Sequence, residues 1–227
     1  MSGPHPEPAD LLAEAGDAWA SIGRLAEAPA GLVEARKALH AVAENVLSPA
    51  RQRATGNEIA LRWYPGGFGT PPFTEDGRER VVRVDGTEVV DTHGTADQRL
   101  EVDPAGARFL AEWFCFGTLV IARLQVEAGP ELEPGLVQLW PEHFDVATEL
   151  GSEQAGQRAA YGASPGDEAH PEPYLYVAPW SARPEGELWN ASGFAGAELS
   201  CAELLTAPDA LVAAADFFDE RVRALTR

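Results

Sequence analysis

Residues 103–126 read DPAGARFLAEWFCFGTLVIARLQV, and this stretch decides the fold that we expect. Asp103 followed by Pro104 is typical of a helix N-cap with proline in the first turn. Apolar residues then cover one helical face and most of the opposite face: Phe109, Leu110, Trp113, Phe114, Phe116, Gly117, Val120, Ile121 and Leu124. A helix that is apolar nearly all round is buried on several sides. The stretch therefore predicts a long central helix, ended by Gly129 and Pro130, around which the rest of the chain packs.

Two amphipathic helices are predicted on the N-terminal side of this segment. Apolar residues recur there at spacings of three and four, which places them on one helical face. They are Leu11, Ala15, Trp19, Ile22 and Ala26 in the first helix, and Leu32, Ala35, Leu39, Val42 and Val46 in the second. We expect the first helix to run from Asp10 to Pro29 and the second to end at Pro49. Joined by a short turn, they form an antiparallel hairpin that packs on the body of the protein.

Alternation with a period of two predicts strands on both sides of the central helix. The expected strands span 57–63, 81–84, 88–91 and 99–102 before it, and 136–140, 144–150, 158–162 and 174–178 after it. Asp85-Gly86 is a hairpin turn signal between two of them. Ser200 and Glu203 have the spacing of a capping box, and a last helix is expected after Pro208.

These elements predict an α+β fold with a mostly antiparallel sheet, a long buried central helix, a C-terminal helix and the N-terminal helical hairpin. We expect a flexible tail at 1–9, the helical hairpin at 10–50 and a single α+β domain at 51–227. Prolines in the tail disfavour regular structure there. A chain of 227 residues is long enough to bury a hydrophobic core.

Composition narrows the classes of function. Lys and Arg number 17 against 36 Asp and Glu, so the net charge is −19. A chain this acidic lacks the basic footprint that nucleic-acid binding needs, and anionic membrane surfaces repel it. The longest apolar run, 109–122, is shorter than the about 20 residues of a membrane span, and residues 1–9 show no apolar targeting segment. We therefore expect a cytoplasmic protein with no nucleic-acid and no membrane partner, in which Cys115 is a buried structural thiol.

Residues 65–72 read PGGFGTPP and form the first candidate site. A phosphate cradle needs glycines that open a helix, and two prolines follow here instead. We interpret the segment as a rigid, sharply folded surface loop at the end of a strand. Because glycine permits close backbone approach, Gly67 and Phe68 are candidates for the lining of a pocket.

Residues 140–145 and 164–174, WPEHFD and SPGDEAHPEPY, supply candidate metal ligands. In a strand His143 and Asp145 share a face, and the second segment adds three carboxylates and one histidine. If that loop folds back over the strand, five side chains converge: His143, Asp145, Asp167, Glu168 and His170. Such a set suits a divalent metal, Zn²⁺, Mn²⁺ or Fe²⁺. The alternative is a polar strand face with internal hydrogen bonds beside a solvated acidic loop.

The second half of the chain is rich in aromatic residues. Tyr174 and Tyr176 share one face of a predicted strand, and several tryptophans are close in sequence. These residues either form a core or line an aromatic cleft. The candidates for the cleft are Trp140, Tyr174, Tyr176, Trp180, Trp189 and Asn190.

The sequence shows no nucleophile constellation. It contains no GxSxG motif, and Ser164 and Ser200 fall in a turn and a cap. Lys37, the one lysine, and His40 both lie on the polar side of their predicted helix, where we expect them to be solvated. Whether the protein is an enzyme stays open.

Two parts of the chain resemble an uncharacterised family of actinobacterial proteins. The motifs that carry the resemblance are LRWYPGGFGTPPF at residues 61–73 and LWPEHFDVA…YGASPGDEAHPEPYLYVAPW within residues 139–180. The resemblance covers most of the chain beyond the tail. It implies no activity and transfers no catalytic residue.

Three hypotheses of function follow. The first, which we favour, is a protein that binds a small molecule or a partner in an aromatic- and acid-lined cleft. The second is a metal-dependent, hydrolase-like enzyme that uses the cluster of histidines and carboxylates. The third is an interaction module whose N-terminal helices dock on a partner or on a second copy, as a homodimer. The third requires an exposed apolar stripe on residues 11–46.

Overall fold

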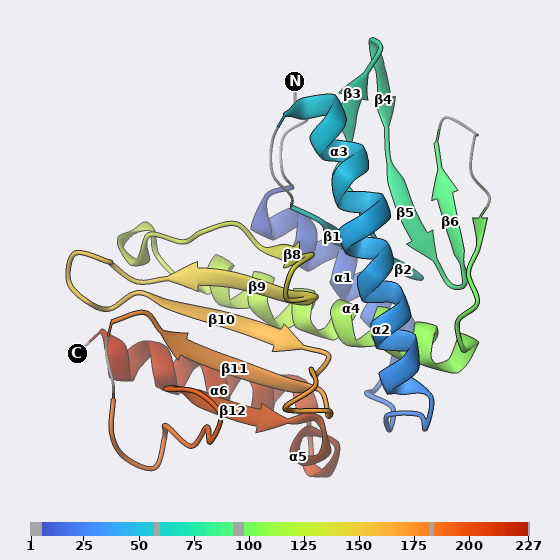
Figure 1. Cartoon of the computed structure of the whole chain (residues 1–227). Coiled ribbons are helices and arrows are strands. Elements are labelled where there is room, and N and C mark those ends of the chain that lie inside the picture. Colours follow the sequence, from blue (N-terminus) through green and yellow to red (C-terminus); the bar gives the residue numbers. More distant parts are fainter. Residues whose placement is uncertain (1–5, 57–59, 93–97, 182–183, 227) are drawn as a thin grey trace.

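The computed structural model describes residues 6–56, 60–92, 98–181 and 184–226, and it has the predicted α+β fold (Figure 1). Its helices are α1 (Pro8–Ile22), α2 (Leu32–Val42), the π-helical turn η1 (Ala43–Leu47), α3 (Ser48–Thr55), α4 (Pro104–Glu127), the 3-10 turn η2 (Pro130–Leu132), α5 (Cys201–Thr206) and α6 (Ala210–Leu225). Its strands are β1 (Arg62–Tyr64), β2 (Gly67–Gly69), β3 (Phe73–Glu75), β4 (Arg78–Arg80), β5 (Val82–Asp85), β6 (Glu88–Asp91), β7 (Gln98–Arg99), β8 (Gln138–Trp140), β9 (Asp145–Leu150), β10 (Ala159–Ser164), β11 (Tyr174–Pro179) and β12 (Ala197–Ser200).

The strands form two antiparallel sheets and a separate hairpin of β3 and β4. The strand orders are β1-β2-β5-β6-β7 and β12-β11-β10-β9-β8. Leu61 and Leu139 exchange two backbone hydrogen bonds, of 2.8 and 3.0 Å, and this isolated bridge joins the two sheets beside β1 and β8. Buried apolar side chains from both sheets and from α1, α2, α4 and α6 belong to one hydrophobic core.

Helix α4 is the central buried helix that the sequence predicts. Asp103 caps it by accepting a hydrogen bond from the backbone N–H of Gly106 at 3.0 Å. Strands of both sheets and the helices α1, α2 and α6 pack on it. By length and composition α4 also qualifies as a membrane span, but 78 % of its most apolar window is buried inside the fold, which is the environment of a core helix.

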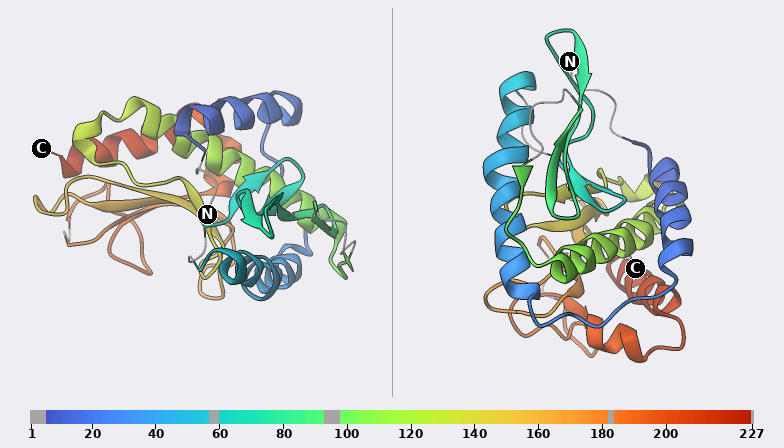
Figure 2. Two further views of the ribbon diagram at one scale, coloured as in Figure 1. Left: turned by 90° about the horizontal axis from the view of Figure 1, so that it is seen from above. Right: turned by 90° about the vertical axis from the view of Figure 1, so that its right-hand side faces the viewer.

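The two N-terminal helices lie on opposite sides of α4, rather than face to face as an antiparallel hairpin would place them (Figure 2). On one side, Trp19 of α1 packs against Phe116 of α4 with ring centroids 5.3 Å apart. On the other side, α2 approaches so closely that a Cβ at Gly106 would lie 2.5 Å from the Cβ of Ala35. The apolar stripes of both helices therefore pack on α4. Residues 11–46, all of which the structure describes, do not present the exposed apolar stripe that the interaction-module hypothesis requires.

The ends of these helices differ from the prediction. Residues 1–5 of the expected tail are outside the described residues, and α1 begins within the tail at Pro8. It ends at Ile22 and not at Pro29, because the next residue, Gly23, adopts a left-handed conformation (φ 81°) and its N–H bonds to the carbonyl of Trp19.

The second N-terminal helix does not stop at Pro49. The chain continues from α2 through the wider turn η1 into α3, where Pro49 occupies the first turn. Pro49 directly follows the π-helical turn η1, where the regular i→i−4 hydrogen-bond pattern is already interrupted.

The glycine-rich segment is a tight hairpin of β1 and β2, not a surface loop. A Cβ at Gly67 would lie 2.1 Å from the carbonyl oxygen of Val84, and one at Gly69 would lie 2.4 Å from the Cβ of Arg83. The glycines therefore serve the close approach of β2 to β5. Phe68 between them is buried in the core.

Strong local signals gave the right elements. The hairpin of β5 and β6 forms with Gly86 at a positive φ of 59°. Ser200 and Glu203 form the complete capping box of α5. The predicted strand at 57–63 is reduced to β1 and the Leu61 bridge, and residues 57–59 are outside the described residues.

Cys115 is a buried thiol, as predicted. Its Sγ is 3.6 Å from the carbonyl oxygen of Ala15 in α1. Burial raises the pKa of this thiol to about 12, so it is protonated and unreactive at neutral pH.

Candidate ligand-binding cleft

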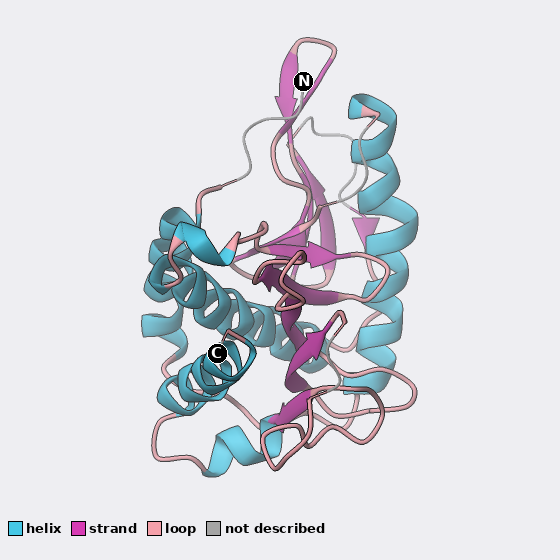
Figure 3. Cartoon of the chain, turned by 90° about the vertical axis from the view of Figure 1, so that its left-hand side faces the viewer, coloured by secondary structure: helices cyan, strands magenta, loops and turns pink. Residues whose placement is uncertain are grey.

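The two faces of the sheet β8–β12 have different surroundings. Helices α4 and α6 pack on one face, where Val146 and Ala163 lie under Gly117 and Tyr161 contacts Phe218. Figure 3 shows the strands between these helices on one side and the α2–α3 column on the other. We call the second face the open face. Among the described residues, helix α2 borders this face, and it does so at one end of the sheet.

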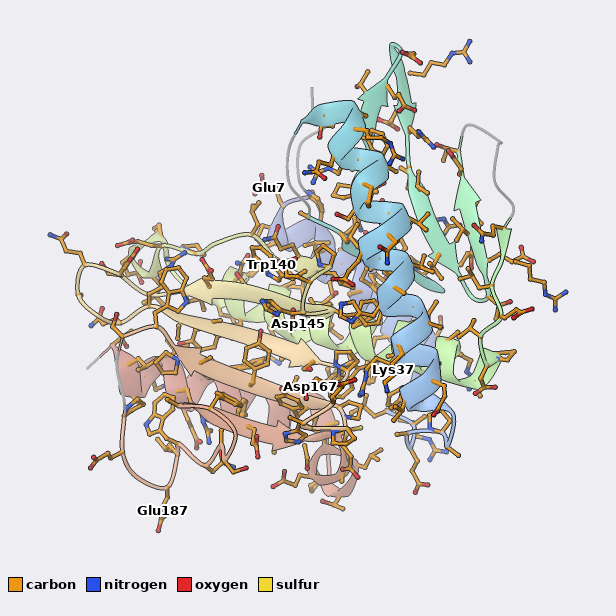
Figure 4. All side chains as sticks on the ribbon, viewed as in Figure 1. Glu7, Lys37, Trp140, Asp145, Asp167 and Glu187 are labelled. Carbon is orange, nitrogen blue, oxygen red and sulfur yellow. The ribbon has the colours of Figure 1, made fainter. Side chains whose placement is uncertain are left out.

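Strand alternation and register decide which side chains reach the open face. Asp145 of β9 precedes the helix-facing Val146, and Tyr176 of β11 lies between Leu175 and Val177, which are both fully buried. Trp140 of β8 pairs directly with Asp145 and so shares its face. A cleft of about 890 Å³ lies between this face and α2. Its lining includes Arg36, Lys37, His40, Trp140, Glu142, His143, Phe144, Asp145, Glu149, Ala160, Ser164, Asp167, Glu168, Tyr174, Tyr176, Ala178 and Phe194. Figure 4 shows Trp140, Asp145, Asp167 and Lys37 around the junction of the sheet and α2.

A contact between Asp145 and Tyr176 crosses the floor of the cleft. Tyr176 is directly opposite Gly162 of the intervening strand β10. A Cβ at Gly162 would lie 2.3 Å from the Tyr176 ring, so only glycine leaves room for the ring to lie across β10. The Tyr176 hydroxyl thereby reaches β9 and donates a hydrogen bond to Oδ2 of Asp145.

The carboxyl of Asp145 is the most perturbed acid of the cleft. The residue is 4 % exposed. Burial raises the pKa of Asp145 to about 6, although the hydrogen bond from Tyr176 and the nearby His143 partly oppose the rise. Its other oxygen, Oδ1, accepts no hydrogen bond from any other described residue. At neutral pH the cleft therefore holds a buried negative charge with one free acceptor oxygen.

We expect Asp145→Asn to make the protein more stable at neutral pH. A pKa raised from 3.8 to about 6 corresponds to about 3 kcal/mol of unfavourable free energy once the folded carboxyl is ionised. This cost develops as the pH rises from about 4 to about 6, and it is absent below that range because the carboxyl is then neutral in both states. The neutral amide avoids the cost but leaves an N–H group to satisfy, so we expect a gain of about 2 kcal/mol at pH near 7.5 and almost none at pH near 4.

Urea denaturation of both proteins at the two pH values measures this difference. Glu168→Gln is the matched control, because it removes the same charge from a side chain that is 89 % exposed. Its effect should not vary with pH in this way. An Asp145→Asn protein that is no more stable than the parent at neutral pH contradicts the burial of an ionised Asp145.

Arg36 fixes the position of the loop between β10 and β11 against α2. Its guanidinium donates to the backbone carbonyls of Pro165 (3.1 Å), Asp167 (2.9 Å) and Pro171 (2.8 Å). Burial lowers the pKa of Arg36, and the charges of Asp167 and Glu168 oppose the decrease. This loop therefore forms one wall of the cleft. Arg36 holds it in place, although the two are about 130 residues apart along the chain.

The turn from β8 to β9 places Asp145 at the start of its strand. Phe144 has a positive φ of 54°, which is unusual for a residue with a side chain. Its buried ring stacks on His40 of α2 at 5.1 Å and packs edge-on against Phe68 and Phe114. The core thus holds the turn in this conformation, and Asp145 follows directly.

The structure brings seven of the predicted site residues to the cleft. These are Trp140, His143, Asp145, Asp167, Glu168, Tyr174 and Tyr176. His143 reaches it from the turn before β9 and not by strand alternation with Asp145, as the sequence suggested.

Five predicted lining residues are not part of the cleft. Gly67 and Phe68 are in the buried β1–β2 hairpin. Trp180 lies against Arg158, whose guanidinium carbon is 5.4 Å from the ring centroid, and Trp189 packs on the hydrophobic core. Asn190 pairs its amide with the backbone of Glu198, an edge-strand contact.

The predicted metal ligands do not form a cluster. In the described parts of the chain, no three His, Cys, Asp or Glu side chains are grouped as a metal site requires. Oδ1 of Asp167 accepts from the N–H groups of Ala169 and His170 and shapes its own loop. The imidazole of His170 stacks on Tyr174 at 4.2 Å and faces Glu198.

Sequence reasoning missed the α2 wall. His40 was expected to be solvated, but its ring stacks on Phe144 and its Nε2 is buried without a hydrogen-bond partner among the described residues. Arg36 and Phe194 also line the cleft. Polar residues on a helix give no signal for a contact with a loop about 130 residues away along the chain, at Pro165.

Comparisons with protein-family models, curated proteins and solved structures find no match to this chain. The resemblance to an uncharacterised actinobacterial family therefore stays a prediction.

Proposed function

We propose that this protein binds a small organic ligand in the cleft between the open face and α2. The observation that carries the proposal is the buried Asp145 carboxylate, which has one oxygen without a hydrogen-bond donor from another described residue and lines a cavity of about 890 Å³. Small-molecule sites are concave, mostly apolar and of about 300–1,000 Å³, with a few polar groups that fix orientation. This cleft is within that range of size, and it combines aromatic rings with polar groups.

The aromatic side chains support the same proposal. Tyr174 and Tyr176 form a tilted pair with ring centroids 6.2 Å apart, and Phe194 packs edge-on against Tyr176 at 6.3 Å. Rings that hold one another in place give a ligand a rigid apolar surface, so little conformational entropy is lost when it binds.

A second cavity of about 900 Å³, between α1, α4 and the turns of the first sheet, supports the proposal less well. Four of its five charged side chains are already paired within the protein: Glu14 with Arg62, Asp85 with Arg83, and Glu112 with Arg108. Cys115, which also lines it, is a protonated thiol. No observation in the described residues favours a metal-dependent enzyme over a binding protein.

The proposal is tested by saturation-transfer NMR with a panel of small aromatic amines, neutral aromatic amides and aromatic carboxylates. Ala160 lies on the open face within the cleft, so Ala160→Trp should fill the site and remove the signals of the compounds that bind. Val212→Trp is the control, because it adds the same ring to an exposed position on α6.

We expect binding to the parent protein and to Val212→Trp, and none to Ala160→Trp at equal concentration. If no compound of the panel binds, or if binding survives in Ala160→Trp, the proposed site is wrong. Circular dichroism of the three proteins shows whether Ala160→Trp is folded. If it is not, Ala178→Trp, on the neighbouring strand and also in the lining, replaces it.

A further inference from the structure

We infer that the ligand of this cleft is a small organic cation, whose ammonium group pairs with the buried carboxylate of Asp145 while its apolar part lies on the aromatic rings of the floor. This inference rests on the proposed function and adds the chemical class of the ligand. It follows from the type of polar group that is left free, from the charge of the lining and from the arrangement of the rings.

The free polar group needs a donor. A carboxylate only accepts hydrogen bonds, and the Tyr176 hydroxyl already donates to one of the two oxygens of Asp145. The remaining oxygen has no donor from another described residue. A buried acceptor without a donor is unfavourable, and a charged donor forms the strongest bond with a carboxylate.

The charge of the lining favours a cation over a neutral donor. The ionisable groups that face Asp145 are Glu142 and His143 from the turn, Glu149 from β9, Arg36, Lys37 and His40 from α2, Asp167 and Glu168 from the loop, and Tyr174 and Tyr176 from β11. Arg36 already donates to three carbonyls, and Nζ of Lys37 lies 3.9 Å from the carboxylate of Glu168. The carboxylates outnumber the cations, and both cations have partners within the protein.

The rings suit the same class of ligand. The faces of tyrosine and phenylalanine attract a cation within about 6 Å, by about 0.5 to 2 kcal/mol. Tyr174, Tyr176 and Phe194 line the cleft together with Asp145. An anionic ligand would gain nothing from these rings and would be repelled by the carboxylates.

The test is a calorimetric titration with three phenyl compounds of similar size and different charge: 2-phenylethylammonium, 3-phenylpropanamide and 3-phenylpropanoate. We expect the ammonium to bind most tightly and the carboxylate most weakly. A blocked pentapeptide with one central lysine distinguishes a free amine from a side chain of a partner. We expect it to bind more weakly than the free amine, and tighter binding of the peptide would overturn the assignment to a small molecule.

Two variants locate the bond. Asp145→Asn should weaken binding of the ammonium about 30-fold, because the charge-assisted bond is lost. Glu187→Gln removes the same charge from an exposed residue outside the cleft lining, so its effect should stay below about threefold. In the parent protein the ammonium should bind about tenfold more weakly at pH near 5 than at pH near 7.5, because protonation of Asp145 competes with the ligand. Asp145→Asn should lose this pH dependence.

The outcomes distinguish this inference from the proposed function. If the neutral amide or the carboxylate binds in the cleft as tightly as the ammonium, or if Asp145→Asn binds the ammonium as the parent does, the ligand is not the cation that we infer. The cleft would then remain a binding site, since Ala160→Trp still blocks it. If none of the compounds binds in a manner that Ala160→Trp abolishes, the proposed function itself is wrong.

Discussion

Replacement of Arg36 by methionine is expected to lower the free energy of unfolding by about 3 kcal/mol or more, because three buried or half-buried carbonyls lose their charged donor at once. The side chain is close to fully buried, and it joins α2 to the carbonyls of Pro165, Asp167 and Pro171. Methionine retains the apolar stem of the side chain, but it ends two atoms short of the guanidinium nitrogens and donates nothing. The loss therefore combines the three hydrogen bonds with a small cavity at the position of the guanidinium.

Urea denaturation measures this effect, and hydrogen exchange of residues 165–171 shows whether the loop loses its anchor. Lys37→Met is the matched control. It makes a similar change at the next residue, but the side chain of Lys37 is 61 % exposed and only 3.9 Å from an exposed carboxylate. We expect it to change stability by less than about 0.5 kcal/mol. An Arg36→Met protein within about 1 kcal/mol of the parent would show that this guanidinium does not hold the loop.

Elements with strong local signals could be predicted from the sequence, and elements without them could not. Asp103 before Pro104 marks the start of α4, and Ser200 with Glu203 marks α5, because caps depend on residues three apart. Strand β2 consists of glycine, phenylalanine and glycine, which has no strand propensity of its own. Strand β2 forms because Gly67 and Gly69 have no side chains and therefore let β5 approach closely. The hairpin of β3 and β4 had a usable signal in Asp76-Gly77, where both residues have positive φ.

In the candidate site, too, some features could be predicted from local sequence signals and others could not. Tyr174 and Tyr176 could be assigned to one face of their strand because strands alternate with a period of two. The contact of Tyr176 with Asp145 depends on Gly162 in a third strand, and register cannot be read from these strands alone. The α2 wall depends on Arg36 and His40, which meet their partners only through tertiary packing.

Replacement of Phe114 by alanine should have the largest effect on stability of the changes considered, about 3 to 5 kcal/mol. The ring is fully buried in α4. It packs edge-on against Phe68 at 6.0 Å and against Phe144 at 5.1 Å, and so links the first sheet to the turn that precedes Asp145. Alanine leaves a cavity between the two sheets that the rigid strands around it cannot close.

Phe114→Leu separates the loss of volume from the loss of the aromatic contacts. It retains most of the apolar volume, so we expect it to cost about 1 to 2 kcal/mol. The double variant with Phe68→Leu should then cost less than the sum of the two single changes, by about 0.5 to 1.5 kcal/mol, because both remove the same edge-to-face contact. Strict additivity in urea denaturation would mean that the two rings contribute independently. Phe114 would then add nothing to the direct contact of Phe68 with Phe144, which also joins the β1–β2 hairpin to the turn before Asp145.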